Sequence, residues 1–373
     1  MADRFEQKGN QLLSLADVQI NGDRPWDIQI HDQRFYQRVL SQGILGLGES
    51  YMDGWWEVEH LDQFIYKLVS ADLNEKVKGL PLLWIAVKAK LLNLQKKSRA
   101  YNIGKRHYDI GNDLYKLMLD KGMNYSCAYW KAAKTLDQAQ EAKLELTCQK
   151  LKLEPGMKIL DIGCGWGGFA KYAAKKYQAE VIGITVSKEQ VKLAKEICSG
   201  LPVEIRLQDY RNVNETFDRI VSIGMIEHVG YKNYRTYMEA AHRCLTDDGL
   251  FLLHTIGNNR STVIGDPWTN KYIFPDGMLP SPLYITQAIE GLFVLEDWHN
   301  FGPHYDKTLM TWYENFNKNW DRIKQNKKYD PRFYRMWKYY LLSCAGAFRA
   351  RSNQLWQIVL SKKGVPGGYE SVR

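Results

Sequence analysis

Three glycines at a fixed spacing, preceded by an aspartate, are the first residues whose types indicate chemistry. In the stretch ILDIGCGWGG (159–168) an apolar run ends at Asp161, and Gly163, Gly165 and Gly168 then satisfy the pattern G-x-G-x-x-G. Glycine is required where the backbone takes a positive φ and approaches a ligand without a Cβ between them. The pattern therefore predicts a buried strand, a tight turn and a helix that bind a nucleotide-type ligand.

The residues around these glycines narrow the choice of ligand. A dinucleotide site has an acidic residue about 20 residues after the glycines, but the sequence there reads GITVS (183–187). A phosphate-binding loop would contain Gly-Lys-Ser/Thr, which this stretch lacks. Asp161 would repel phosphates, whereas it suits a ligand that carries ammonium and sulfonium charges. We therefore predict S-adenosylmethionine (SAM), which has a cationic sulfur and no phosphate.

The elements that must position this ligand alternate along the chain. Strands are expected over 180–187, 203–210, 217–225 and 249–257, and helices over 188–198 and 232–245. Another helix precedes the glycine-rich strand and starts with Thr135 and Gln138 at capping-box spacing. This alternation predicts a parallel sheet covered on both faces, with its ligands at the carboxyl ends of the strands. The stretches at those ends are 163–167, 185–187, 208–210, 224–228 and 254–257.

Length and composition set the broad class. A chain of 373 residues with 45% apolar content exceeds the roughly 250 to 300 residues of a single core, so two domains are expected. The sequence shows neither a signal-peptide pattern nor an apolar run of 18 residues, which predicts a soluble or peripheral protein of the cytoplasm. Six cysteines without a C-x-x-C pair predict reduced thiols and no metal site.

The net charge of +9 is concentrated in two segments. Residues 76–106 hold nine Lys/Arg and no acid, and residues 318–373 hold thirteen Lys/Arg against three acids. Such segments suggest attraction to an anionic polymer or an anionic membrane face, with solvated helix faces as the alternative. Residues 80–99 fit an amphipathic helix on a membrane surface or, equally, an interdomain helix. Nucleic acid is disfavoured as a partner, because SIGMIEHVG (222–230) stands where base methyltransferases usually carry an Asn/Asp-Pro-Pro-aromatic motif.

Several motifs in order carry a resemblance to a known family. LDIGCGWG resembles motif I of the Rossmann-like SAM methyltransferases. The chain as a whole resembles the cyclopropane-fatty-acyl-phospholipid synthases and, more loosely, the mycolic acid cyclopropane synthases. The resemblance extends almost end to end, from LGLGESYMDGWW (45–56) to AGAFRARSNQLWQ (345–357). Between these ends it includes YSCAYW (125–130), LDIGCGWGG (160–168), ITVSKEQ (184–190), SIGMIEHVG (222–230), LLHTIG (252–257) and FGPHYD (301–306).

This resemblance implies an α/β fold and a division of the chain. The expected fold is a Rossmann-like SAM-methyltransferase sheet with a helical lid, plus a small N-terminal α+β domain. The expected parts are a lipid- or membrane-associated domain over 1–80, a basic amphipathic linker helix over 81–104 and a SAM-dependent catalytic domain over 105–373. Within the last part, 140–257 would be the core and 258–373 a lipid-pocket extension.

The resemblance also implies an activity. A methylene unit would pass from SAM to a cis double bond of an unsaturated acyl chain in a phospholipid, forming a cyclopropane ring, with bound bicarbonate as the base. The expected partners are the unsaturated phospholipid and the inner, anionic face of the membrane, where the protein would be peripheral, with a homodimer as one expected assembly. The alternative is a SAM-dependent methyltransferase that acts on RNA or a small molecule.

Site residues follow from the resemblance, motif by motif. The bicarbonate would be held by Cys127, Glu227, His254, Tyr305 and the backbone N–H of Ile256. For SAM, the resemblance implies Tyr125, Ser126, Gly163 and Gly165 at the methionine end, Thr185 and Gln190 at the ribose, Asp209 and Tyr210 at the adenine, and Gly224 after the fourth strand. His107, His228 and Cys344 lie in or beside matched motifs without an assigned chemical step.

Overall fold

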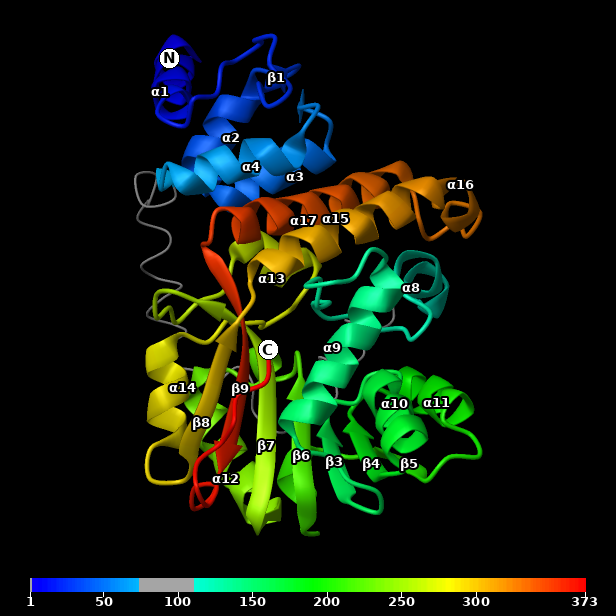
Figure 1. Cartoon of the computed structure of the whole chain (residues 1–373). Helices are drawn as coiled ribbons and strands as arrows, with labels where there is room; N and C mark the ends of the chain where they lie inside the picture. The colour runs from blue at the N-terminus through cyan, green and yellow to red at the C-terminus, as the bar shows by residue number, and fades with distance from the viewer. Residues whose placement is uncertain (1, 74–110) are drawn as a thin grey trace. The chain divides into compact units, whose positions relative to one another are not determined.

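The computed structural model describes residues 2–73 and 111–373, which form two compact units (Figure 1). Of the described residues, unit 1 takes 2–73, 263–275 and 305–353, and unit 2 takes 111–262, 276–304 and 354–373. The units therefore interleave along the chain, whereas the division expected from sequence is contiguous. The predicted linker helix over 81–104 lies outside the described residues, and the roles assigned to 1–80 and 258–373 stay predictions.

Unit 2 is built on a seven-stranded sheet with the order β5-β4-β3-β6-β7-β9-β8. The pairs β3–β4, β3–β6, β4–β5 and β6–β7 are parallel, as the alternating pattern predicts. The strands are β3 (Lys158–Ile162), β4 (Glu180–Thr185), β5 (Val203–Leu207), β6 (Phe217–Ile223), β7 (Leu245–Asn258), β8 (Val294–Asn300) and β9 (Asn353–Ser361). The Rossmann-like methyltransferase sheet expected from the motifs is thus confirmed.

One part of the expected sheet is different. Strands β8 and β9 form an antiparallel pair, with Trp298 opposite Ile358, so the sheet is mixed and not purely parallel. The sequence pattern did not reveal these strands, because they pair across more than fifty residues and the segment between them contains the long helices α15 and α17. β9 lies between β7 and β8, which places its buried residues next to those of β7.

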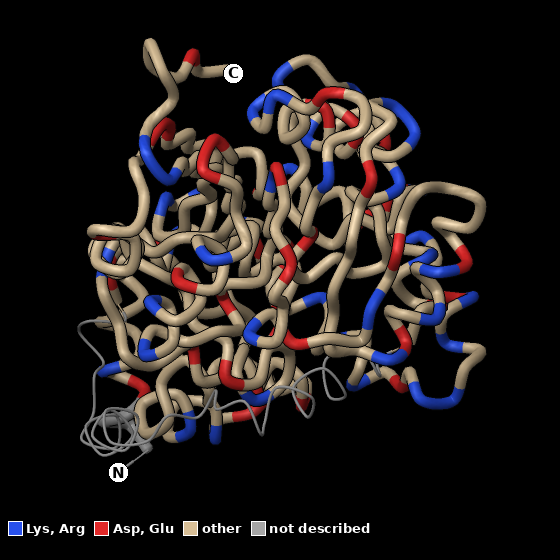
Figure 2. The backbone as a smooth tube through the Cα atoms, turned by 90° about the horizontal axis from the view of Figure 1, so that it is seen from below, with Lys and Arg blue, Asp and Glu red and all other residues tan. Residues whose placement is uncertain are grey.

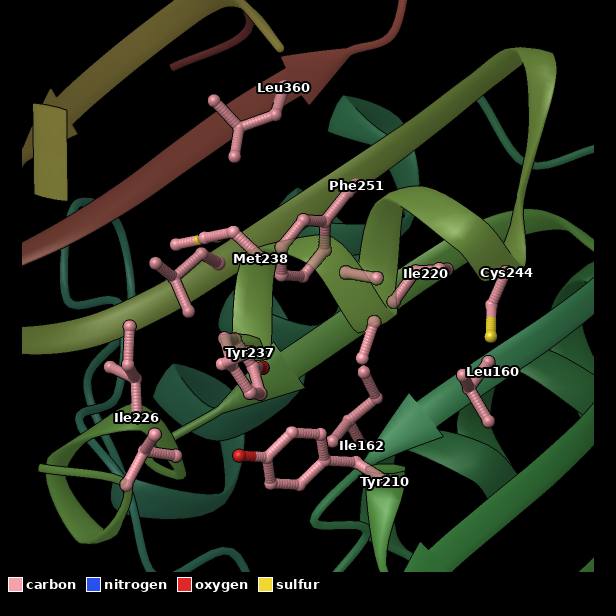
Figure 3. Packing of buried hydrophobic residues seen from close by; sticks show 14 of the residues in the cluster. Leu160, Ile162, Tyr210, Ile220, Ile226, Tyr237, Met238, Cys244, Phe251 and Leu360 are labelled. Carbon is pink, nitrogen blue, oxygen red and sulfur yellow. The ribbon is translucent and has the colours of Figure 1, made fainter. Parts of the chain in front are cut away.

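Helices cover both faces of this sheet. One face packs through Leu160, Ile220 and Phe251 against Tyr237 and Met238 of α12 (Figure 3). Buried residues of α14 belong to the same cluster. The opposite face packs against α9 and α10. The helices of unit 2 are α8 (Asn112–Met118), α9 (Leu136–Lys150), α10 (Gly168–Tyr177), α11 (Lys188–Ile197), α12 (Tyr234–Cys244) and α14 (Pro282–Ile289), with short 3-10 turns η1 (Tyr210–Asn212), η2 (Ile226–His228) and η3 (Tyr231–Asn233).

The predicted capping box fixes the start of α9. The N–H of Gln138 donates to Oγ1 of Thr135 at 3.3 Å, and Oε1 of Gln138 accepts the N–H of Thr135 at 3.3 Å. Each contact satisfies a backbone or side-chain group at the helix start that would otherwise lack a partner. The capping box predicted from the sequence is confirmed.

Unit 1 is mainly helical and includes the small N-terminal α+β part. A two-residue antiparallel pair, β1 (Gln29–Ile30) with β2 (Trp56–Glu57), accompanies α1 (Ala2–Ser14), α2 (Arg34–Gln42), α3 (Ile44–Met52) and α4 (Leu61–Ser70). Its other helices are α13 (Pro267–Tyr272), most of α15 (Pro303–Lys318), α16 (Trp320–Ile323) and α17 (Pro331–Arg349). Helix α17 packs on α4 through Gly346 and is bridged to it by Arg349, which pairs with Asp62 at 2.6 Å and with Asp306.

Charges of opposite sign are interspersed along the described chain (Figure 2). Several cations from the basic C-terminal segment have acidic partners, which the count along the sequence does not reveal. They are Arg332 with Asp53, Arg335 with Glu57, Arg349 with Asp62 and Asp306, Lys363 with Asp247, and Arg373 with Asp297. Much of that segment's positive charge is therefore neutralised locally. Within the part of the chain that the structure describes, no helix is long and apolar enough to cross a membrane.

Candidate active site

The turn between β3 and α10 leaves bare backbone at one position. Gly163, Gly165 and Gly167 have φ values of +84°, +54° and +84°. A Cβ at Gly163 would lie 2.9 Å from Cγ of Met225, and one at Gly167 would lie 2.9 Å from Sγ of Cys198. A Cβ at Gly165 would meet no described atom within 4 Å. Gly165 is therefore where a ligand can approach the turn most closely.

Residues 120–126 lie against the start of α10. A Cβ on Gly168 would lie 2.7 Å from Oδ1 of Asn124 and 2.9 Å from the carbonyl oxygen of Gly122. The carboxylate of Asp120 accepts the N–H groups of Gly122 and Asn124, both at 2.8 Å, and Nδ2 of Asn124 at 2.8 Å. These contacts hold the YSCAYW motif (125–130) beside the glycine-rich turn, as the SAM assignment requires.

Two buried side chains of α9 fix Ser126 from the other side. Nε2 of Gln140 donates to the carbonyl oxygen of Ser126 at 2.8 Å, and Nζ of Lys143 donates to its Oγ at 3.1 Å. Burial lowers the pKa of Lys143 to about 8, although the charge of Asp120 opposes this shift. Lys143 thus acts as a buried donor that orders the segment predicted to contact SAM.

Tyr125 is half-buried and reaches the same turn through aromatic contacts. Its ring lies 5.0 Å from the ring of Tyr115, which in turn lies 5.0 Å from Trp166 inside the glycine-rich stretch. Nε1 of Trp166 donates to Asn112 at 3.0 Å. Rings at these separations pack edge to face or tilted, so α8 and the turn share one aromatic layer.

Asp161 lies near the end of β3 and is buried. Its Oδ2 has no hydrogen-bond partner among the described residues. Burial raises the pKa of Asp161 to about 7, and the nearby charge of Lys143 opposes the rise. A cation beside this carboxyl group would stabilise its ionised form. This agrees with the cationic ligand predicted from the sequence.

Thr185 and Gln190, predicted near the ribose, contact each other. Oγ1 of Thr185 donates to Oε1 of Gln190 at 2.6 Å and accepts the N–H of Ser187 at 3.2 Å. Oγ of Ser187 accepts the N–H of Gln190 at 3.3 Å as the N-cap of α11. Thr185 ends β4 and Gln190 lies in the first turn of α11, so the pair lies at the carboxyl edge of the sheet, one strand away from the glycine-rich turn.

The residues predicted at the adenine differ in their surroundings. Asp209 caps η1 and pairs with the guanidinium of Arg211 at 2.6 and 2.8 Å, so this carboxylate already has a cationic partner. Tyr210 is buried and its ring lies 5.1 Å from Tyr237 in an edge-to-face contact (Figure 3). Gly224 has φ +67° and open space at its Cβ position.

Glu227 and Ile256 are brought together from two strand ends. The N–H of Ile256 donates to Oε1 of Glu227 at 2.8 Å. Oε2 of Glu227 is buried and has no partner among the described residues. Burial raises the pKa of Glu227 to about 7, while the bond from Ile256 opposes the rise. This carboxyl group can therefore carry or release a proton near neutral pH. The N–H of Ile256, which the resemblance assigns to bicarbonate, donates to Glu227 in this structure.

His254 lies in β7, opposite Ile223 of β6, and its carbonyl oxygen accepts the N–H of Gly224 at 2.9 Å. Its Nδ1 lies 3.4 Å from Nε2 of Gln357 in β9, and its Nε2 is buried without a partner among the described residues. Burial, followed by the nearby cations Lys143 and Lys150, lowers the pKa of His254 well below its ordinary value. The ring is therefore neutral at physiological pH.

The remaining predicted ligands lie in different units. Cys127 is fully buried in unit 2, and its Sγ donates to the carbonyl oxygen of Ala128 at 3.3 Å. Tyr305 belongs to unit 1, where its ring lies 4.6 Å from that of Phe348 and 6.0 Å from that of Trp312. The roles of both residues stay predictions.

Three further residues in or beside matched motifs remain without a chemical step. Burial lowers the pKa of His228 to about 4 and raises that of Cys344 to about 12, so neither group ionises readily near neutral pH. His107 lies outside the described residues.

Sequence reasoning missed a polar stripe on α9. Gln140, Lys143, Thr147 and Lys150 are spaced three or four residues apart and are at most 1% exposed. Helical periodicity places them on one face, but such residues are normally assigned to the solvent side. The sequence does not single out this face, because polar residues (Glu141, Glu145 and Gln149) also stand between these four positions, beside apolar ones.

The sheet order and the glycine-rich turn after β3, with open backbone at Gly165, define a SAM-dependent methyltransferase. Residues 95–358 match the family model described as mycolic acid cyclopropane synthetase, and the chain belongs to this family. The resemblance seen in the motifs is thereby confirmed.

Similar proteins extend this result over the whole chain. The chain is 55% identical over 373 residues to the cyclopropane-fatty-acyl-phospholipid synthase of Escherichia coli K12. The alignment covers 100% of this chain and 97% of that relative. The cyclopropane synthase MmaA2 of Mycobacterium tuberculosis is similar in structure, with a TM-score of 0.66, 31% identity and coverage of 73% of this chain and 100% of that one. The mycolic acid cyclopropane synthase CmaA1, solved with SAH and CTAB, has a TM-score of 0.63, 32% identity and coverage of 70% and 98%.

Proposed function

We propose that this protein transfers a methylene unit from SAM to a cis double bond of an unsaturated acyl chain in a membrane phospholipid, with bound bicarbonate as the general base. The observation that carries the proposal is the 55% identity, over the full chain, to a relative named for cyclopropane formation on phospholipid acyl chains. The bicarbonate rests on the motif resemblance and on the chemistry of the buried polar groups.

The residues at the sheet edge fit SAM. Bare backbone at Gly165 and Gly224 leaves room for close approach, and the unpartnered Oδ2 of Asp161 favours a cation nearby. The hydroxyl and amide of Thr185 and Gln190 offer polar groups suited to a ribose. These features agree with the positions that the motifs assign.

A small acid or anion also fits the buried polar atoms. Oε2 of Glu227 and Nε2 of His254 lack partners among the described residues, and burial of an unpaired polar group is costly. When bound, SAM would supply an electrophilic methyl group, and bicarbonate would supply the base that accepts the proton lost on ring closure. Glu227, with its pKa near 7, can share a proton with a neighbouring anion, and neutral His254 can donate one hydrogen bond.

The protein itself must align the two reacting groups and exclude water from them. An alkene is a weak nucleophile, so its π bond must be held in line with the reacting methyl group and water must be excluded. Cys127, Glu227 and His254 are at most 7% exposed. Their burial keeps water from trapping a cationic centre on the lipid.

The test is an assay of full-length protein with SAM and vesicles of an unsaturated phospholipid. The expected product has acyl chains heavier by one CH₂ unit and shows cyclopropane ring protons by NMR, which distinguish it from a branched isomer of equal mass. Unchanged acyl chains, together with methyl transfer to added RNA or a small molecule, would establish the alternative function.

Bicarbonate is tested in the same assay. The rate should fall in buffer stripped of carbon dioxide and recover when bicarbonate is added. If the stripped buffer gave the full rate, another base would be required, and the lipid activity could still stand.

Peripheral association with an anionic membrane face is part of the proposal. It predicts binding to anionic vesicles that weakens as salt rises, since surface charges act over about a Debye length. Sedimentation with anionic and with neutral vesicles measures this. Equal, salt-insensitive binding to both kinds of vesicle would remove the electrostatic component.

A further inference from the structure

The polar stripe of α9 leads from the Ser126 segment to His254. Lys143 contacts Ser126, as described above, and Oγ1 of Thr147, four residues later, lies 3.2 Å from Nε2 of Gln357. Nε2 of Gln357 also lies 3.4 Å from Nδ1 of His254. All of these side chains are buried and belong to unit 2. A buried chain of this kind must assign each proton to one acceptor.

The hydroxyl of Thr147 determines which group donates in each hydrogen bond of this network. Its Oγ1 lies 2.8 Å from the carbonyl oxygen of Lys143, one turn earlier, which is the geometry of a hydroxyl that donates back to its own helix. A hydroxyl has one proton. Oγ1 must therefore act as an acceptor toward Gln357, and the atom of Gln357 that faces it must be the amide nitrogen.

The amide of Gln357 then determines the tautomer of His254. The amide nitrogen carries two protons, one for Oγ1 of Thr147 and one for Nδ1 of His254. Oε1 of Gln357 has no partner among the described residues, which agrees with the nitrogen serving both neighbours. A ring nitrogen that accepts a hydrogen bond carries no proton, so Nδ1 is unprotonated, and the single N–H proton of the buried neutral ring lies on Nε2.

We propose that Gln357, oriented by Thr147, is a positioning residue that holds His254 in the Nε2–H tautomer. His254 then presents a single N–H donor at the buried atom that lacks a partner in the described structure. In the reverse tautomer Nε2 would be an acceptor and would repel the oxygen of a bound anion. The catalytic consequence rests on the proposed function, whereas the tautomer itself does not.

The first test is spectroscopic and needs no substrate. Full-length protein labelled with ¹⁵N-histidine is examined by long-range ¹H–¹⁵N correlation, and the His254 signals are assigned from their loss in His254→Gln. The expected pattern is a protonated Nε2 and an unprotonated Nδ1. A protonated Nδ1 in the wild type would overturn the proposal without affecting the proposed function.

Variants test the cause. Gln357→Glu keeps the shape and replaces the donor with an acceptor, so it should move the proton to Nδ1. Gln357→Met keeps the approximate length and removes the donor, so both tautomers should appear. Thr147→Val should also give a mixture, whereas Thr147→Ser retains the hydroxyl and should restore the wild-type pattern. An unchanged Nε2–H signal in Gln357→Glu and in Gln357→Met would exclude Gln357 as the determinant.

Kinetics separates positioning from structure. Losing one well-placed donor in a catalytic site commonly lowers kcat by about 10²- to 10³-fold, and we expect Gln357→Glu to fall in this range while the Kd for SAM changes less than about twofold. A matching loss of SAM affinity would indicate general disruption. If the wild type transferred nothing to lipid but showed the Nε2–H tautomer, the proposed function would fail and the tautomer assignment would remain.

Discussion

The backbone N–H of Ile256 donates to Oε1 of Glu227 at 2.8 Å, and this bond joins the η2 turn after β6 to the end of β7. It fixes one carboxyl oxygen and leaves the other buried without a partner among the described residues. A carboxyl group held in this way has its free oxygen at a defined place and its pKa near 7.

Replacing Glu227 by Gln should separate turnover from cofactor binding. The amide can still accept the Ile256 N–H, but it cannot take up or release a proton. We expect kcat to fall by about 10²- to 10⁴-fold, the range of general acid–base contributions, with the Kd for SAM unchanged. Isothermal titration and the vesicle assay measure the two quantities. Equal losses of affinity and rate would contradict this role.

The same variant should change how stability depends on pH. The folded pKa of Glu227, about 7, lies above the ordinary value of 4.5, so between these pH values the unfolded state ionises first and the folded state loses stability as pH rises. At 1.36 kcal/mol per unit, the loss is at most about 3 kcal/mol. The free energy of unfolding of Glu227→Gln, relative to wild type, should therefore increase from pH 4 to pH 8. A constant difference would mean that Glu227 ionises normally.

Asp161 should link SAM binding to proton release. Burial raises its pKa to about 7 against the opposing charge of Lys143, so Asp161 is mostly protonated at pH 6. A cationic ligand favours the ionised form. SAM affinity should rise with pH toward 7, by at most about tenfold per unit. Asp161→Asn should reduce this slope in calorimetric titrations from pH 5.5 to 8. The same pH dependence of SAM affinity in both proteins would show that ionisation of Asp161 is not coupled to SAM binding.

Two glycines of the turn provide a matched pair. Alanine at either position meets a left-handed backbone, which costs about 1 to 2 kcal/mol. At Gly163 the new Cβ also meets Met225 at 2.9 Å, whereas at Gly165 it meets open space. Gly163→Ala should lower thermal stability more than Gly165→Ala does. Gly165→Ala should lower SAM affinity more than Gly163→Ala does, when each loss of affinity is compared with the variant's loss of stability. The opposite ranking would mean that the ligand does not approach Gly165.

Gly346 tests the packing of unit 1. A Cβ there would lie 2.6 Å from the carbonyl oxygen of Asp62 and 2.9 Å from the N–H nitrogen of Tyr66, so α17 and α4 would have to move apart. We expect Gly346→Ala to lower the free energy of unfolding by about 1 to 3 kcal/mol, the usual cost of overpacking. Gly54→Ala is the comparison variant, because its Cβ would meet nothing within 4 Å, so it measures only the cost of a left-handed backbone at φ +75°, about 1 to 2 kcal/mol. No measurable loss of stability in Gly346→Ala would show that the two helices adapt to the added methyl group.

The sequence by itself determined the parts of the protein that depend on local pattern. The spacing of Gly163, Gly165 and Gly168, the capping box at Thr135 and the strand–helix alternation through β7 each reflect neighbours within one turn or one strand. Asp161 indicated the charge of the ligand for the same reason, since it adjoins the turn it serves.

Only the tertiary structure decided which distant side chains meet. Strands β8 and β9, the bond between Ile256 and Glu227, and the contact of Gln357 with His254 join segments separated by about thirty to one hundred residues. Lys143 and Thr147 look like solvent-facing helix residues until the fold buries them against Ser126 and Gln357. The physical reason is burial: removal from water makes each of these polar groups require a partner, and no local pattern states which partner the folded chain supplies.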